Sequence, residues 1–239
     1  MTRTIDPSPG AALLERLRAI DTPSVCNAIE VAEGRRGFDA FTRGTPLASD
    51  PGAPAMVGFA ATAVIAAREP PAAPPEAIRA RRLEYFRYMA AAPRPSIAVV
   101  QDIDHPDCIG AWWGEVHAVV HEGLGLCGVL TDGAMRDLGD LAPDFPIVAG
   151  SVSPSHGFVH VREVNTPVTV FGLEICPGDL VHADRHGAVV VPPAVWPSLE
   201  AAIDRLFAAE RIILEPARRP GFDIDALEAA WRAFEKART

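Results

Sequence analysis

The sequence predicts a mixed α/β domain that contains both parallel and antiparallel strands. Helical and strand-like segments alternate in the first half of the chain, whereas short β-branched runs cluster after Gly157. Helical spacing returns near the C-terminus. The chain has 239 residues, enough to bury a substantial core, and it shows no internal repeat and no convincing boundary between two units. We therefore expect a single domain over residues 1–239.

The first elements are two short helices within residues 11–33. Leu13 and Leu17 recur at helical spacing, and Asp21 can cap a second helix that starts near Pro23. Further elements are expected up to residue 150: a loop at 34–55, a buried strand at 56–67, an exposed Pro-rich segment at 70–75, a helix at 76–92, strands at 96–101, 128–131 and 146–149, and a helical turn at 136–141.

Residues 110–125 predict a further helix, because Trp113, Val116 and Val120 lie on one stripe and Gly123 or Gly125 can end it. The later part of the chain predicts strands separated by turn residues, followed by two helices. The strands are expected at 158–164, 167–175, 179–184 and 188–193, and the helices at 194–214 and 223–237.

Charge and hydropathy exclude several classes of protein. The net charge of −9 repels phosphate backbones, and no strong basic patch offsets it, so we expect no nucleic-acid partner. No apolar stretch is long enough to span a membrane, and residues 1–10 do not form a secretory signal. We expect a cytoplasmic protein that does not bind membranes.

The four cysteines are scattered and form no CxxC pair. Their positions are Cys26, Cys108, Cys127 and Cys176. A domain of this size does not need disulfide bonds, so we expect reduced thiols that pack as small buried hydrophobic residues.

Gly123, Gly125 and Gly128 match the letters of a G-x-G-x-x-G dinucleotide motif. In such a motif the glycines follow a strand and open a helix, whose N-terminal N–H groups then meet the pyrophosphate. Here the expected order is helix, glycines, strand. We interpret the glycines as a turn that ends a helix.

Two histidine pairs have spacings that invite a metal hypothesis. His117 and His121 are four residues apart on the expected helix, but no HExxH motif and no third ligand accompany them. We expect His121 to be solvated or to lie at the C-terminus of the helix. His182 and His186 flank Asp184 on a strand and its turn, and they are interpreted as structural.

The segment with the clearest chemistry follows the strand that ends at Thr131. Asp132-Gly133 turns the chain, and Arg136-Asp137 follow at the carboxyl end of the strand, where open α/β sheets bind ligands. An adjacent Arg and Asp can simply pair or cap a helical turn. Alternatively, the guanidinium group binds a carboxylate through two parallel bonds, and one carboxylate anchors Mg²⁺. Together they would bind a 2-oxo acid.

A longer ordered pattern surrounds this segment: Gly114-Glu115, Gly125, Gly128 and Asp132-Gly133-x-x-Arg136-Asp137. It resembles the G-E…G-x-x-G-x-x-x-D-G-x-x-R-D block of the RraA-like family. That family contains 4-hydroxy-4-methyl-2-oxoglutarate and 4-carboxy-4-hydroxy-2-oxoadipate aldolases and the regulator of ribonuclease activity A. Three more segments fit the family: Thr22-Pro23 with Asn27-Ala28, Val99–Asp102, and Pro177–Pro192.

The resemblance implies an α/β/β fold like the phosphohistidine swivelling domain, with a core at about 12–215 and a helical extension at about 216–239. It also implies trimers or hexamers with sites at subunit interfaces, and a divalent metal, Mg²⁺ or Mn²⁺, bound by Asp137. Arg136 would bind the carboxylate of a small 2-oxo acid substrate, and Glu115 would take part in proton exchange. Backbone contacts to the substrate would come from Gly114, Glu115, Val116 and His117.

The implied activity is metal-dependent (class II) cleavage of a 4-hydroxy-2-oxo acid to pyruvate and a second carbonyl compound, with oxaloacetate decarboxylation as a side activity. Lys236 is the only lysine, which independently argues against a Schiff-base aldolase. The base for the 4-hydroxyl proton would be an ordered water relayed through Glu115. Two alternatives remain: a non-catalytic regulator of the RraA type, and a lyase or hydratase acting on a sugar-derived acid.

The chain departs from the family at three places. Asn27 stands where an Asp is common, residues 68–92 are longer than in compact members, and residues 214–239 are additional. These differences bear on the substrate and the oligomer rather than on the Arg136–Asp137 pair.

Overall fold

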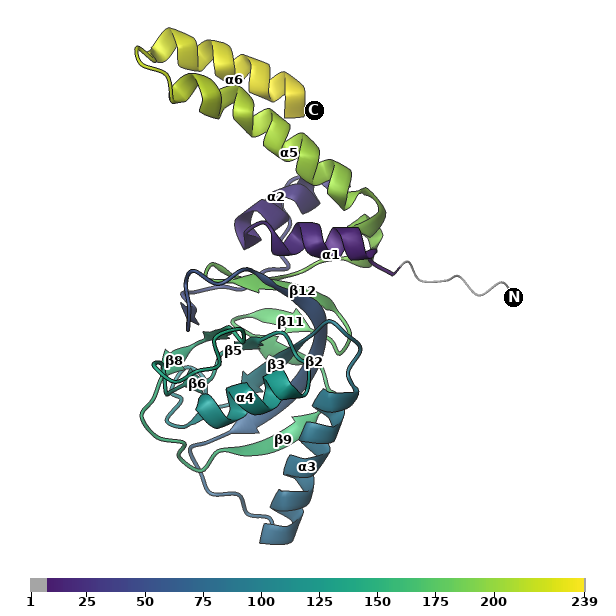
Figure 1. The fold of residues 1–239 in the computed structure, drawn as a ribbon, viewed down its shortest axis with the longest axis vertical. Coiled ribbons are helices and arrows are strands. Elements are labelled where there is room, and N and C mark those ends of the chain that lie inside the picture. The colour runs from purple at the N-terminus through teal and green to yellow at the C-terminus, as the bar shows by residue number, and fades with distance from the viewer. Residues whose placement is uncertain (1–7, 239) are drawn as a thin grey trace, which may run out of the picture.

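The computed structural model describes residues 8–238, and Figure 1 shows a mixed sheet flanked by helices with a helical arm extending from one end. The helices are α1 (Ala11–Arg18), α2 (Thr22–Glu33), α3 (Pro75–Ala91), α4 (Glu115–Gly123), the 3₁₀ turn η1 (Pro193–Val195), α5 (Trp196–Ala217) and α6 (Ile224–Arg238). The strands are β1 (Leu47–Ala48), β2 (Met56–Ala66), β3 (Ser96–Asp102), β4 (Ala111–Trp113), β5 (Val129–Thr131), β6 (Ala134–Met135), β7 (Ile147–Ala149), β8 (Ser151–Val152), β9 (His160–Val164), β10 (Val168–Val170), β11 (Leu173–Ile175), β12 (Leu180–Asp184) and β13 (Gly187–Val190).

The main sheet runs in the order β1-β7-β5-β3-β2-β12-β13. Strands β2, β3, β5 and β7 are parallel, and β1, β12 and β13 pair antiparallel at the two sides. The long β2 pairs with β12 through its first half and with β9 through its second. The predicted α/β class with mixed strand directions is therefore confirmed.

Alternating residues of the main sheet face two different layers. One face of β2, β3 and β5 packs against α3 and α4, where Tyr85 and Trp113 are fully buried. The other face packs against the β10–β11 hairpin. A third apolar cluster joins α1, α2 and α5 to the β12–β13 edge. The first cluster also contains Trp113 and Met135, the last residues of β4 and β6, which directly precede the candidate segments.

A second, three-stranded parallel sheet has the order β4-β6-β8 and was not predicted. Residues 110–125 do not form one helix: Ala111–Trp113 form a strand, and the helix starts only at Glu115. The predicted stripe is also wrong, because Trp113 is buried in the strand whereas Val116 is 67% exposed on the helix. The helical turn predicted at 136–141 is instead an irregular turn.

The glycine run was interpreted correctly. Helix α4 ends at Gly123, and β5 starts at Val129. Between them, Gly125 and Gly128 adopt positive φ values. The order is thus helix, turn, strand, the reverse of a dinucleotide-binding motif.

All four cysteines are free thiols, as expected, but Cys176 is exposed and the other three are only partly buried. The prediction that all four are buried is therefore wrong. Among residues 8–238, no helix is both long and apolar enough to cross a membrane.

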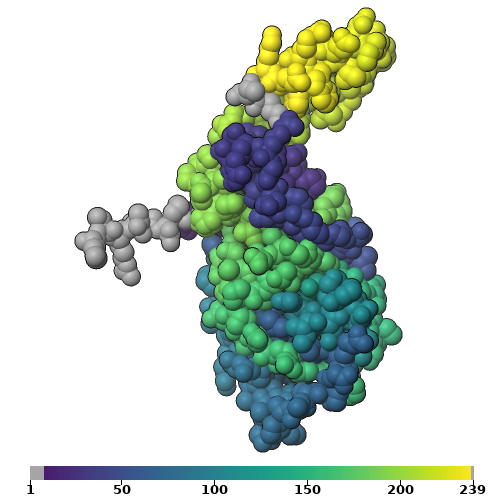
Figure 2. All heavy atoms as spheres, turned by 180° about the vertical axis from the view of Figure 1, so that it is seen from behind, coloured from purple at the N-terminus to yellow at the C-terminus, as the bar shows by residue number. Residues whose placement is uncertain are grey.

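Helices α5 and α6 form the arm, with α6 folded back along the far end of α5 (Figure 1). Figure 2 shows from behind that this arm projects beyond the body of the protein. The helices predicted at 194–214 and 223–237 are confirmed with small shifts of their bounds.

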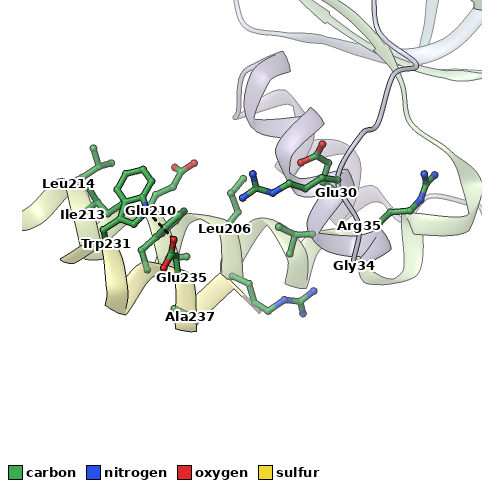
Figure 3. Close-up of a pocket in the computed structure, with 15 residues that line it drawn as sticks. Glu30, Gly34, Arg35, Leu206, Glu210, Ile213, Leu214, Trp231, Glu235 and Ala237 are labelled. Atoms are coloured by element: carbon green, nitrogen blue, oxygen red, sulfur yellow. Dashed lines mark hydrogen bonds between the residues drawn. The ribbon is translucent and has the colours of Figure 1, made fainter. Parts of the chain in front are cut away.

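Between α2 and the arm lies a hollow of about 1190 Å³ (Figure 3). Glu30 and Arg35 lie on the α2 side, and Leu206, Glu210 and Trp231 lie on the arm. The hollow is large, but none of the residues predicted to carry chemistry lines it. Size alone therefore does not identify the functional site.

Candidate functional site

Pairing of β4 with β6 brings together two segments that are more than twenty residues apart in the sequence. Ala111 pairs with Ala134 and Trp113 with Met135, so the residues that follow each strand emerge side by side. The backbone N–H of Arg136 continues this pairing and donates to the carbonyl oxygen of Trp113 at 2.8 Å. The two candidate segments predicted from the sequence are therefore brought together at one point.

The Asp137 carboxylate lies at the N-terminus of α4. Its Oδ2 atom accepts a hydrogen bond from the backbone N–H of Glu115 at 3.2 Å. Arg136 Nε lies 3.6 Å from the same oxygen, and both side chains are about one-third exposed (34% and 33%). A helix N-terminus favours negative charge because its first N–H groups lack partners within the helix.

An unusual backbone conformation aims this carboxylate. Asp137 has φ of +57°, in the left-handed region that Asp tolerates better than most residues. Its carbonyl oxygen accepts from the backbone N–H of Asp140 at 2.9 Å, which closes a tight turn. A helix starting at Arg136 is incompatible with this φ value, which explains why the predicted helical turn is absent.

Gly114 is required by close approach of the Arg136 and Asp137 side chains. A Cβ atom at this position would overlap Asp137 Oδ2 and would lie 3.0 Å from Arg136 Cγ. Any larger residue would displace the two groups that the sequence singled out. The glycine therefore permits the contact between the carboxylate and α4.

The residues after Gly114 present backbone N–H groups at the start of α4. Glu115 and Val116 are exposed, and His117 is half-buried. In the described part of the chain, the N–H groups of Val116 and His117 have no hydrogen-bond acceptor, whereas that of Glu115 serves Asp137. Two backbone donors are thus available to an anion beside Arg136.

The donor set fits a hard divalent cation. Asp137 supplies one partly exposed carboxylate, and Mg²⁺ and Mn²⁺ are typically bound by one or two carboxylates with water and substrate oxygens completing the shell. Within residues 8–238, no three or more His, Cys, Asp or Glu side chains cluster as a ready-made metal cage. The arrangement suits a cation that binds together with its substrate.

His121 was predicted to be solvated or to lie at a helix terminus, and it is instead fully buried. Its Nε2 atom is 2.7 Å from the hydroxyl group of Tyr85, and its Nδ1 atom is 2.6 Å from the carbonyl oxygen of His117. Burial lowers the pKa of His121 to about 4, so the ring is neutral near pH 7. No local pattern indicates this contact, because Tyr85 lies on a helix 36 residues earlier in the chain.

Two buried aspartates at neighbouring strand ends were missed as a group. Asp102 ends β3 and Asp132 follows β5, and both are nearly inaccessible. Asp132 Oδ1 accepts from the backbone N–H of Asp102 at 2.8 Å, while Asp102 Oδ2 is buried without a partner in the described residues. Burial raises the pKa of both carboxyl groups, that of Asp132 to about 6. Parallel pairing of the two strands was the signal that could have found them.

Two of the other matching segments, around Thr22 and around Asp184, contact each other. The backbone N–H of Thr22 donates to Asp184 Oδ2 at 2.9 Å, and the Thr22 hydroxyl is 3.1 Å from His182 Nδ1. His182 is fully buried, in agreement with its structural interpretation, while His186 is exposed and bonds Asp184. These contacts attach α2 to the β12–β13 hairpin.

Comparison with known proteins matches residues 22–190 to the RraA-like (aldolase/RraA) family model. A putative 4-hydroxy-4-methyl-2-oxoglutarate aldolase of Halalkalibacterium halodurans is 33% identical over 36% of this chain and 42% of its own length. An uncharacterised protein of Methanocaldococcus jannaschii is 31% identical over 44% of this chain and 51% of its own. The chain thus spans about half the length of these curated relatives, or less.

Solved structures agree on the fold. An uncharacterised protein of Pseudomonas syringae pv. tomato has a TM-score of 0.71 at 24% identity, covering 94% of this chain and 95% of its own. Streptomyces coelicolor RraAS2, described as an unusual member of the RNase ES inhibitor RraA family, has a TM-score of 0.64 at 22% identity, covering 89% and 99%. At these identities the likeness concerns the fold.

Proposed function

Because the chain belongs to the RraA-like family, we propose that it is a divalent-metal-dependent aldolase that cleaves a 4-hydroxy-2-oxo acid and releases pyruvate. The observation that carries this proposal is the junction of Arg136, Asp137 and the N-terminus of α4. It combines a cation-binding carboxylate, a carboxylate-binding guanidinium group and free backbone N–H groups within one small region. These are the groups that a 2-oxo acid requires.

The difficult step in this reaction is the formation of a carbanion at C3 of the pyruvyl fragment. A divalent cation on Asp137 would supply Lewis-acid charge that stabilises the developing enolate. Arg136 binds the substrate carboxylate through its guanidinium group, whose Nε atom lies 3.6 Å from Asp137 Oδ2. The N–H groups of Val116 and His117 orient the anionic end of the substrate.

Glu115 is the group that the family resemblance associates with proton exchange. Its side chain is exposed in the first turn of α4, next to the residues that bind Asp137. From there it exchanges protons between the site and solvent. The buried carboxylates of Asp102 and Asp132, at the ends of β3 and β5, have no part in substrate binding in this proposal.

Assembly into trimers or hexamers is part of the proposal. Helix α4 exposes Val116, Val119 and Val120, a larger apolar surface than a solvated helix needs. Sedimentation velocity of the wild-type protein and of Val119→Glu tests this assembly. We expect a wild-type oligomer that the introduced charge weakens, and a monomeric wild-type protein would contradict the proposed assembly.

The activity is tested by measuring pyruvate release from 4-carboxy-4-hydroxy-2-oxoadipate and from oxaloacetate. The wild-type protein and Asp137→Ala are assayed with Mg²⁺, with Mn²⁺ and with EDTA. We expect metal-dependent release that is lost in the variant. No turnover of either compound by folded, metal-loaded wild-type protein would reject the aldolase and favour a regulatory binding protein or a lyase for another acid.

A further inference from the structure

His117 differs from the other residues of the first turn of α4 because its ring is held in place. Its Nδ1 atom forms a hydrogen bond with the carbonyl oxygen of Trp112, and its ring centroid lies 4.2 Å from that of Trp112. A carbonyl oxygen can only accept, so Nδ1 carries the proton. The Nε2 atom of the neutral ring is therefore a free acceptor.

The described part of the chain offers no hydrogen-bond partner to His117 Nε2. This atom is not fully buried and keeps some exposure to solvent. Side chains in the first turn of a helix lean toward its N-terminus, which is where Arg136 and Asp137 meet α4. His117 thus resembles a base that is oriented through one nitrogen and open at the other.

A buried hydrogen-bond chain from α3 stabilises this arrangement. Because His121 Nδ1 donates to the carbonyl oxygen of His117, His121 Nε2 must accept from the hydroxyl group of Tyr85. Phe86 packs beside both histidine rings, with its ring centroid 6.0 Å from that of His117 and 5.7 Å from that of His121. Helix α3 thus helps to fix His117 from a segment that lies about 30 residues earlier in the chain.

The surroundings keep the ring neutral. Burial lowers the pKa of His117, and the positive charges of Arg82 on α3 and Arg136 after β6 lower it further, while the hydrogen bond to Trp112 opposes them. His121 on the same helix lies 5.9 Å from the His117 ring, centroid to centroid, and Tyr85 on α3 bonds His121. A neutral imidazole can accept a proton near pH 7, whereas a charged one cannot.

We infer that the imidazole of His117 is the general base that removes the proton of the substrate's 4-hydroxyl group. The hydroxyl proton moves to Nε2, the C3–C4 bond breaks as a C4 carbonyl forms, and the electron pair passes into the enolate of pyruvate. The same proton then returns from Nε2 to C3 and gives pyruvate. This inference rests on the proposed aldolase function and replaces the water relay through Glu115 with a direct base.

The test compares two reactions that share an enolate but differ in their need for this base. Aldol cleavage requires removal of a hydroxyl proton, whereas oxaloacetate decarboxylation loses CO₂ without it. For His117→Gln we expect kcat for cleavage to fall by about 10²–10⁴-fold and kcat for decarboxylation to fall by less than about tenfold. In the wild-type protein, kcat/KM for cleavage should decline in acid, at a pH below the ordinary His pKa of ~6.5. This acid limb should be absent in His117→Gln.

The Gln side chain can still donate to the Trp112 carbonyl oxygen, so the variant is expected to fold, which circular dichroism checks. His186→Gln, on the distant β12–β13 hairpin, is the matched control, and Glu115→Gln tests the relay. Equal losses of both reactions in His117→Gln, an unchanged acid limb, or a larger cleavage loss in Glu115→Gln would overturn the inference. Wild-type protein that releases no pyruvate at all would instead reject the proposed function on which it rests.

Discussion

Asp132 and Asp137 lie on the two sides of the short strand β6, and the fold gives them opposite environments. Asp132 is 4% exposed, accepts from the backbone N–H of Asp102, and has a pKa raised by burial to about 6. The Asp137 side chain is one-third exposed and accepts a single N–H from the start of α4. A carboxylate that must receive a cation needs open coordination positions and charge, and only Asp137 has both.

Replacing each aspartate by asparagine should break this comparison most clearly. Asp137→Asn removes the charge that holds the cation, and we expect metal-dependent pyruvate release to fall by at least about 10³-fold. Asp132→Asn should stay within a few-fold of wild type. Steady-state rates at saturating Mg²⁺ measure both, with thermal melts as the folding control. Equal losses of pyruvate release in the two variants would mean that Asp137 has no special role in binding the cation.

The buried Asp132 should make the unfolding free energy of the protein depend on pH. Because the pKa of Asp132 is raised in the folded state, its protonated form is favoured there, and stability is lost as pH rises from ~4 through about 6. The difference in unfolding free energy between Asp132→Asn and wild type should grow by up to about 3 kcal/mol from pH 4 to pH 7. Urea titrations at several pH values measure it. A constant difference would mean that Asp132 does not titrate in this range.

Gly114→Ala tests the contact between the carboxylate and the helix without removing a functional group. The new Cβ would overlap Asp137 Oδ2, and a displacement of this size should lower kcat by about 10²-fold. Gly123→Ala, at the end of the same helix with open space around it, is the control and should be neutral or slightly stabilising. Similar activity in the two alanine variants would argue against a fixed position of Asp137.

Tyr85→Phe has the smallest expected effect. It leaves Nε2 of the buried His121 without its donor, at a cost of about 1–2 kcal/mol in unfolding free energy. Denaturant unfolding of Tyr85→Phe measures this change. An exposed substitution on the arm, Glu228→Gln, should change stability by less than about 0.5 kcal/mol. If both variants unfold at the wild-type midpoint, the hydrogen bond between Tyr85 on α3 and His121 on α4 does not contribute to stability.

The sequence was sufficient to single out Arg136, Asp137 and Gly114, which the fold brings together, because these residues follow an ordered local pattern. It failed where tertiary contacts override that pattern. The bulky residues at 111–113 imitate a helical stripe, yet they pair with β6 because Gly114 separates them from α4. The positive φ of Asp137 accompanies its contact with α4, a tertiary contact that no local propensity encodes.

Buried polar partners were the second class of failure. Asp102 and Asp132 meet only because β3 and β5 are parallel neighbours, and His121 meets Tyr85 only because α3 packs against α4. Such pairs depend on register and packing between elements that are far apart in the chain. A single sequence gives the residues but not their partners.

The proposal that a cation held by Asp137 stabilises the enolate of pyruvate can be tested by hydrogen–deuterium exchange at the methyl group of pyruvate, followed by proton NMR in D₂O. This reaction requires enolate formation but does not depend on the rest of the substrate. We expect Mg²⁺-dependent exchange by the wild-type protein and by Asp132→Asn, with none above background in EDTA or with Asp137→Asn. Exchange that is absent in the metal-loaded wild type, or unchanged in Asp137→Asn, would contradict the assignment of this site.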